Sequence, residues 1–375
     1  MATEAVGLRL IGHADLGGRG DGCQIMRRAD VLYVAHMGRA GMSVLDVRDP
    51  RRPTLLHQTE RPPGAHSHKL QLAGDLLVQN VERQGAGEPA RTGVVIYDVS
   101  QPRAPREVGF FPVGGPGVHR MWFVDGRYVH MAAGAPGYSD QFYMVADLER
   151  PDRPAEVGRW WLPGMHVAGG EARSSRPGER FACHHPIVHG ARAYVGWWDA
   201  GFVILDVQNL AQPRLVSHLD WSPPFGGATH TVLPLRGGRL AVVTDEALAD
   251  NCQEGDKRAW VVDLREETRP VPIATLPEPG PGFCARGGRY GPHNLHENRP
   301  GTFVSDERIY LTYFNAGVRV YDLADPFRPR EVASFVPEPP PGQATPQWND
   351  LLVTADGLIF VTDRLNGGLY VLEHA

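Results

Sequence analysis

Residues 203–207 read Val-Ile-Leu-Asp-Val, and close relatives of this stretch recur along the chain. Successive copies are separated by 52, 49, 59, 57, 59 and 51 residues, counted between their acidic ends. The acidic residues that mark these ends are Asp46, Asp98, Asp147, Asp206, Asp263, Asp322 and Glu373. Self-similarity at such a period predicts a solenoid or a propeller.

The surroundings of each copy indicate a unit of four short strands. Two apolar runs come before the acidic strand, and a proline-marked turn such as Asp325-Pro326-Phe-Arg-Pro329 leads to a further strand. Proline presets a turn and cannot donate to a sheet, so it separates strands. Helical periodicity is essentially absent. We therefore predict an all-β fold, a seven-bladed β-propeller with four-stranded blades.

The two ends of the chain complement each other. The seventh repeat stops after its third strand, at Glu373, while a spare strand opens the chain. We expect this N-terminal strand, residues 5–12, to complete the last blade and close the ring. Residues 1–375 would then form a single propeller domain.

The strand Val-Ile-Leu-Asp-Val followed by a proline turn resembles the LVIVD repeat family, which is named for this motif. The resemblance covers the whole chain. It implies the propeller fold and says almost nothing about activity.

Composition narrows the classes of partner. The net charge is −5 without a basic stripe, which argues against nucleic acid. The apolar runs are too short to cross a membrane, and the N-terminus shows no secretion signal. The four scattered cysteines indicate buried or free thiols in a reducing compartment. We expect a cytoplasmic protein with a small-molecule substrate; its oligomeric state stays open.

Histidines stand at nearly the same place in five successive repeats. Each lies at the start of the expected innermost strand, so the imidazoles would converge on the propeller axis at the face that carries the long loops. Blade one has Gln24 at this place, blade seven has Trp348 or Asn349, and His296 competes with His293 in blade six. The five predicted metal ligands are His68, His119, His185, His230 and His293.

Neutral imidazole is the commonest protein ligand for iron, manganese, copper and zinc. We therefore predict a mononuclear, histidine-ligated metal with an open position, Fe(II) being favoured and Mn or Cu possible. The plan resembles carotenoid cleavage oxygenases, seven-bladed with a central iron held by four histidines. It also resembles selenium-binding proteins, including methanethiol oxidases, which are histidine-rich and contain copper.

The favoured reaction is that of an oxidase or oxygenase on a small, partly apolar organic substrate. Candidate catalytic residues are His184, Tyr290, His296 and Glu297, and candidate substrate-pocket residues are Gln24, His66, Trp348 and Asn349. One alternative keeps the metal but makes the protein a lyase or hydrolase. Another uses histidine directly as acid or base. A third is a non-enzymatic interaction propeller in which the histidines form a structural polar layer. The repeated Asp residues are expected to bond backbone groups at the outer turns.

Overall fold

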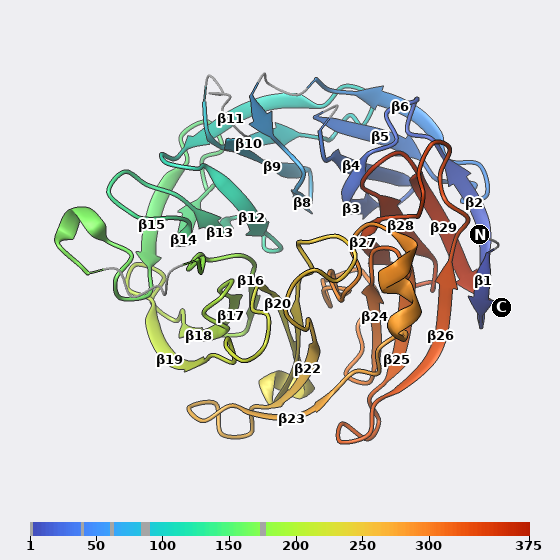
Figure 1. The fold of residues 1–375 in the computed structure, drawn as a ribbon. Helices are drawn as coiled ribbons and strands as arrows, with labels where there is room; N and C mark the ends of the chain where they lie inside the picture. The colour runs from blue at the N-terminus through green and yellow to red at the C-terminus, as the bar shows by residue number, and fades with distance from the viewer. Residues whose placement is uncertain (1–2, 39–40, 61–63, 84–90, 173–177) are drawn as a thin grey trace.

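The computed structural model describes residues 3–38, 41–60, 64–83, 91–172 and 178–375. Within these ranges the strands form seven antiparallel sheets around one axis (Figure 1). This arrangement confirms the predicted all-β, seven-bladed propeller. The helices of the described ranges are short 3₁₀ turns, and none is long and apolar enough to cross a bilayer. They are η1 (Val167–Gly169), η2 (Arg236–Gly238) and η3 (Pro281–Arg286).

The first four blades follow one another along the chain, each running from the axis outward. Blade one contains β3 (Gly22–Arg28), β4 (Val31–His36), β5 (Met42–Asp46) and β6 (Thr54–Gln58). Blade two contains β7 (Ala65–His66), β8 (Leu70–Ala73), β9 (Leu76–Arg83), β10 (Gly93–Asp98) and β11 (Arg106–Pro112). Blade three contains β12 (Val118–Trp122), β13 (Tyr128–Ala133), β14 (Phe142–Asp147) and β15 (Ala155–Trp160). Blade four contains β16 (Pro186–His189), β17 (Arg192–Gly196), β18 (Phe202–Asp206) and β19 (Arg214–Leu219).

The remaining blades bring the two ends of the chain together (Figure 1). Blade five contains β20 (Thr229–Leu235), β21 (Leu240–Asp245), β22 (Ala259–Asp263) and β23 (Val271–Thr275). Blade six contains β24 (Arg308–Thr312), β25 (Val318–Asp322), β26 (Arg330–Val336) and, at its outer edge, β1 (Glu4–Val6). Blade seven contains β27 (Trp348–Val353), β28 (Ile359–Asp363), β29 (Gly368–His374) and β2 (Leu8–Ala14).

The N-terminal strand closes the ring, as the sequence predicted. β2 pairs with β29 from Leu8 opposite His374 to Ala14 opposite Leu369. The segment is divided differently from the expected 5–12, because residues 4–6 leave blade seven and pair with β26 of blade six. The chain therefore links two neighbouring blades at the point of closure.

Blade six departs from the regular pattern at the axis. Residues 293–296 take the innermost position and bond to β24, but they do not form a regular strand. His293 N donates to the carbonyl of Thr312, and His296 N donates to that of Tyr310, both at 3.0 Å.

The repeated Asp residues have the structural role that the sequence predicted. In six blades the Asp carboxylate accepts a hydrogen bond from the backbone N–H two residues later, at 2.7–3.0 Å. This Asp-capped turn leads each third strand into its proline turn. The motif is therefore a fold signal, repeated because every blade needs the same turn.

The cysteines are only partly as expected. Cys23 and Cys183 are buried and free, whereas Cys252 and Cys284 form a disulfide. The expectation of four thiols was wrong because the long loops of blades five and six bring together two residues that are 32 positions apart.

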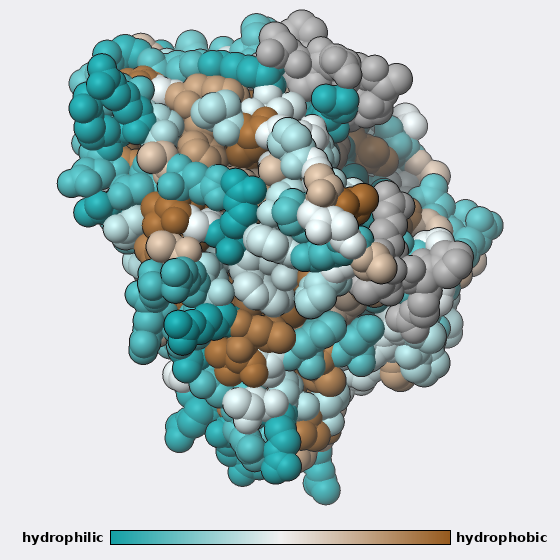
Figure 2. Space-filling view, turned by 90° about the vertical axis from the view of Figure 1, so that its left-hand side faces the viewer, coloured by the Kyte–Doolittle hydropathy of each residue, from teal (hydrophilic) through white to brown (hydrophobic). Residues whose placement is uncertain are grey.

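Hydrophobic clusters fill the spaces between neighbouring blades, and one continuous cluster runs from blade two to blade four. The outer side of blades three and four shows apolar residues in separate small patches among polar ones (Figure 2). Scattered exposed apolar residues are normal for a folded surface.

Candidate metal centre at the propeller mouth

The innermost segment of every blade carries one extra residue, and this bulge builds the site. Residues 119 and 120 both face Ala132 of the second strand, and residues 23 and 24 both face Ala35. Single extra residues interrupt the registers of blades five and seven. In blade four, Gly196 bonds to both His184 and His185. Bulges re-aim side chains and are frequent beside active sites.

The bulges sort the channel residues into two rings. The first residue of each bulge belongs to the upper ring, which consists of Cys23, His68, His119, His184, His230, His293 and Asn349. The second belongs to the lower ring, which consists of Gln24, Lys69, Arg120, His185, Thr231, Asn294 and Asp350. Six of the seven upper-ring residues line one cavity of about 190 Å³.

The predicted register is therefore one residue off in two blades. In blade four His184, not His185, stands with the other histidines, and in blade one Cys23 takes the place expected for Gln24. The upper-ring histidines form an unbroken arc. Successive ring centroids are 4.9, 4.6, 4.1 and 4.4 Å apart from His68 to His293.

Hydrogen bonds at Nδ1 orient the histidines of the arc. His119 Nδ1 donates to Glu82 at 2.9 Å, and His184 Nδ1 donates to the carbonyl of His230 at 3.1 Å. His293 Nδ1 lies 3.0 Å from the carbonyl oxygen of Asn349. An imidazole whose Nδ1–H is held by such an acceptor keeps its Nε2 lone pair for a metal.

His230 Nδ1 is also held by a hydrogen bond, but its Nε2 has a protein partner as well. Its Nδ1 lies 2.6 Å from Thr231 Oγ1, and its Nε2 accepts from Arg120 at 3.2 Å. A metal bound at Nε2 would replace the Arg120 contact, while Arg120 keeps its bonds to Asn294 and Glu297. Burial holds the pKa values of His184, His230 and His293 well below their usual range, so these imidazoles are neutral.

One contact is hard to understand without a cation. His119 Nε2 and His184 Nε2 are 2.9 Å apart, although the Nδ1 of each already donates elsewhere. With both Nδ1 atoms donating, the two Nε2 lone pairs face each other unless a proton or a metal ion lies between them. Two ligands at right angles around a metal with bonds of about 2.1 Å would stand about 3 Å apart. The spacing fits two nitrogens that share an ion.

Two carboxylates that the sequence analysis missed reach the mouth. In blades two and five, one residue of the second strand lies opposite the bulge. Glu82 and Glu246 each come two positions after that residue. The signal was present in the sequence as an acidic residue at the same repeat position, Asn-Val-Glu82 and Thr-Asp-Glu246.

Among the described residues, two groups of side chains have ligand atoms within 4.8 Å of one another, and each contains two histidines and one glutamate. The first is His66, His68 and Glu82, and the second is His184, His230 and Glu246. A bound metal lies in the plane of each imidazole that holds it. His66 and His68 are stacked 3.8 Å apart with planes 8° from parallel, so no single position serves both.

The second group has the better geometry. The His184 and His230 planes are inclined by 45°, which lets both lone pairs point to one place. Glu82, in the first group, is already occupied by His66, His119 and Gln141. Burial would raise the pKa of Glu82, but the neighbouring His119 and His66 hold it well below its usual range. Glu82 is therefore an anionic anchor for His119.

Two aromatic residues pack against the histidine arc from equivalent turns, Trp-Trp-Asp-Ala-Gly (197–201) and Tyr-Phe-Asn-Ala-Gly (313–317). Trp198 packs edge-on against His184, and Phe314 stacks on His293 with centroids 4.5 Å apart. Both have left-handed backbones, with φ of 45° and 47°. Such strain in bulky residues is concentrated at functional sites.

Below the mouth, the lower ring forms a buried polar layer around Glu297. Arg120 Nη2 donates to Glu297 at 3.0 Å, Gln24 Nε2 donates at 3.4 Å, and His185 Nε2 lies 3.6 Å away. Glu297, Gln24 and His185, which were predicted for catalysis, substrate binding and metal ligation, thus lie together beneath the upper ring. Burial and nearby Arg120 hold the pKa of His185 well below its usual range.

The other predicted residues are distributed between mouth and core. His66 and Asn349 line the mouth cavity together with His184. His296 is buried, with Nε2 bonded to Asn298 and Nδ1 accepting from the backbone of Tyr310. Trp348 is fully buried between Phe335 and Tyr370, because its side chain belongs to the core of blade seven. Tyr290 packs on Phe283 beside the disulfide.

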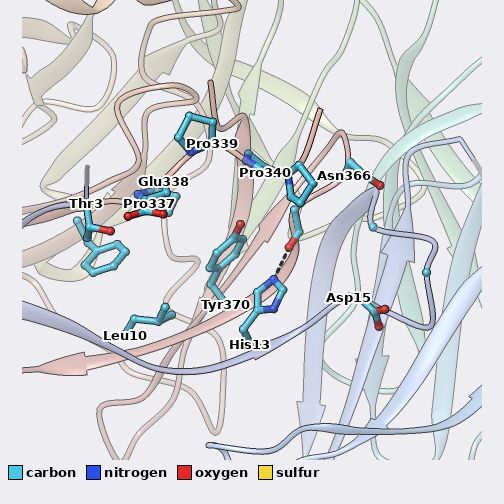
Figure 3. Close-up of a pocket in the computed structure, with 15 residues that line it drawn as sticks. Thr3, Leu10, His13, Asp15, Pro337, Glu338, Pro339, Pro340, Asn366 and Tyr370 are labelled. Carbon is cyan, nitrogen blue, oxygen red and sulfur yellow. Dashed lines mark hydrogen bonds between the residues drawn. The ribbon is translucent and has the colours of Figure 1, made fainter. Parts of the chain in front are cut away.

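A larger cavity, of about 620 Å³, lies away from the upper ring, where the two ends of the chain close the propeller (Figure 3). Pro337, Pro339 and Pro340 form one wall, and His13 and Tyr370 face them. His13 Nε2 bonds to the carbonyl of Gly367 at 2.6 Å. Neither of the two possible metal-binding groups found among the described residues lines this cavity, so size alone does not identify the functional site.

Comparison with known proteins supports the fold. Residues 187–220 match the family described as the LVIVD repeat. The match falls on blade four, the blade that contains the Val-Ile-Leu-Asp206-Val strand. The chain is therefore a seven-bladed β-propeller in which one blade matches this repeat. No curated protein matches the chain in sequence.

Solved structures share its architecture at low identity. A hypothetical selenium-binding protein from Sulfolobus tokodaii is 13% identical, with a TM-score of 0.59 over 91% of this chain and 89% of that one. The periplasmic gluconolactonase PpgL of Pseudomonas aeruginosa is 14% identical, with a TM-score of 0.58 over 90% and 93%. U3-55K is 11% identical, with a TM-score of 0.64 over 99% and 100%. At these identities the likeness concerns the fold alone.

Proposed function

We propose that this propeller is a metal-dependent enzyme with one divalent transition metal ion at its mouth. His184, His230 and Glu246 would hold the ion, and His119 would stand beside it as a further nitrogen ligand. The observation that carries the proposal is the 2.9 Å approach of two Nε2 atoms whose Nδ1 atoms both donate elsewhere.

The donor set favours iron. Two histidines and one carboxylate with open positions are typical of non-haem Fe(II) oxygenases, and His119 would add one nitrogen to this set. Bound Fe(II) would supply the electrons that activate O₂, and we propose oxidation of a small organic substrate as the reaction class. The protein contributes orientation through the Nδ1 bonds, and Trp198 and Phe314 provide an apolar wall beside His184 and His293.

Metal analysis of the purified protein tests the site. We expect one ion per chain after reloading with Fe(II), Mn(II) or Cu(II), and loss of the ion in His184→Ala and Glu246→Gln. His189→Ala is the matched control, because His189 lies exposed at the other end of the same innermost strand. Failure of every metal to bind the wild-type protein would contradict the proposal.

The reaction class needs a separate measurement. Nitric oxide binds Fe(II) at an open position and gives a characteristic electron paramagnetic resonance signal. We expect this signal in the Fe(II)-loaded wild-type protein and its absence in His184→Ala. An ion that is bound but inaccessible to nitric oxide would contradict oxygen activation, and it would leave the metal site in place.

A further inference from the structure

Four cationic side chains line the mouth cavity, and they differ in their partners. Lys69 Nζ donates to Asp350 at 2.7 Å, and Arg180 Nε donates to Asp140 at 2.8 Å. Arg289 Nη1 donates to Glu246 at 3.0 Å. Among the described residues, no carboxylate bonds to Arg364, whose Nη2 reaches only the sulfur of Met37 at 3.8 Å.

Arg364 and Arg289 approach the same aromatic ring. The two guanidinium carbons each lie 5.8 Å from the centre of the Phe314 ring, which stacks on His293. Burial, and then the charge of Arg289, lower the pKa of Arg364. Glu246 bonds to Arg289, and Asp350, which also acts on Arg364, bonds to Lys69. Arg364 is therefore a half-buried cation without a bonded carboxylate among the described residues, and a bound anion would offset the cost of its partial burial.

The same two arginines also connect the mouth to a second cavity. This cavity, of about 340 Å³, is lined by Arg289 and Arg364 together with residues that include Thr345, Gln347 and Leu365. The histidine cavity has about 190 Å³. A molecule held by both guanidinium groups would therefore reach the metal on one side and have room on the other.

We infer that the substrate is a small organic acid whose carboxylate binds between Arg289 and Arg364. Guanidinium groups match carboxylates in shape and can donate to them in pairs. A carboxylate is favoured over a phosphate because Glu246 and Asp250 also face these cavities and would repel a dianion. The carboxylate site does not depend on the proposed metal. The inference rests on the proposed function only where it assigns the reaction to the end of the acid that lies near the metal.

Calorimetric titration of the metal-loaded protein tests this inference. The probes are acetate, benzoate and phenylacetate, each beside its neutral amide, and inorganic phosphate. We expect at least one carboxylate to bind and its amide to bind at least tenfold more weakly. Arg364→Ala should weaken carboxylate binding about tenfold or more, as loss of a charged hydrogen bond does, with unchanged metal content. Arg328→Ala, an exposed arginine at a proline turn, should have no effect.

The outcomes separate the two proposals. Binding of none of the carboxylates, equal affinity in Arg364→Ala, or tighter binding of phosphate would overturn the inference while a measured metal would leave the proposed function standing. Carboxylate binding that depends on Arg364, in a protein that takes up none of the three metals on reloading, would support the anion site and contradict the proposed function. If Arg364→Ala does not fold, carboxylate affinity is measured in Arg364→Gln instead. The comparison of each carboxylate with its amide in the wild-type protein then tests the same inference.

Discussion

At the scale of single residues, the mouth depends on how each imidazole is held. Glu82 accepts from His119 Nδ1, and this bond aims Nε2 at His184. Carboxylate partners of metal-binding histidines typically contribute 10- to 100-fold to metal affinity. Replacing the Glu82 carboxylate therefore tests directly whether His119 carries its proton on Nδ1.

We predict that Glu82→Gln weakens metal binding by about 10- to 100-fold without unfolding the protein. Competition with a chelator of known affinity measures the change. Glu373→Gln, which alters only a partly exposed pair with Arg9, should bind metal like the wild type. Unchanged affinity in Glu82→Gln would mean that His119 is not oriented for a metal.

Asp245 gives a pH dependence of stability with a definite sign. The carboxylate is buried and accepts from Trp221, Trp260 and Thr229, but burial dominates and raises its pKa to about 6. A pKa that is higher in the folded state means that stability is lost as pH rises through about 6. The cost above this pH is at most about 3 kcal/mol, for a shift of about two pKa units.

We therefore predict that the melting temperature of Asp245→Asn, relative to the wild type, rises between pH 4 and pH 8. Thermal unfolding followed by circular dichroism across this range measures the difference. Comparing the pH trend, and not the absolute stability, removes the cost of replacing an acceptor by an amide. A difference that stays flat with pH would show that Asp245 titrates normally.

At the scale of elements, the bulge explains what the sequence could and could not show. Four of the five upper-ring histidines were found because the repeat places them at one position of the innermost strand. His184 and His185 could not be separated by sequence, because both residues of a bulge reach the channel and only the bonds to Gly196 assign them. Glu82 and Glu246 could not be predicted from the innermost strands, because both lie at the end of the second strand of their blades.

The turn after each third strand is the element that repeats most faithfully. In blade four, Asp206 accepts from the backbone of Gln208 at 3.0 Å. We predict that Asp206→Ala lowers the free energy of unfolding by about 1 kcal/mol, the usual net value of such a bond. Asp206→Asn keeps the acceptor and should retain most of this stability in denaturant titrations. Equal losses in both variants would assign the effect to charge.

At the scale of the whole molecule, closure holds the seven blades in one ring, and the ring brings the histidines together. Sequence repeats predicted the blade number and the closing strand, since each follows from a pattern along the chain. The Cys252–Cys284 disulfide and the pairing of Arg289 with Arg364 could not be predicted. They depend on how long loops from different blades meet in space.

Removal of residues 1–14 deletes β2 and exposes the edge of β29, so we predict a much lower melting temperature and aggregation. Removal of residues 1–7 deletes only β1 and leaves the closing pairs in place. The shorter deletion should therefore melt close to the full chain. Similar melting of both truncated chains would contradict the role of β2 in closure.

The central claim is that one metal ion is held at the mouth by the second histidine group. Anomalous diffraction from crystals of the metal-loaded protein, collected at the absorption edge of the metal, tests it most directly. The account predicts one peak bonded to His184 Nε2, His230 and Glu246. A peak between His66, His68 and Glu82, or no peak at the mouth, would contradict it.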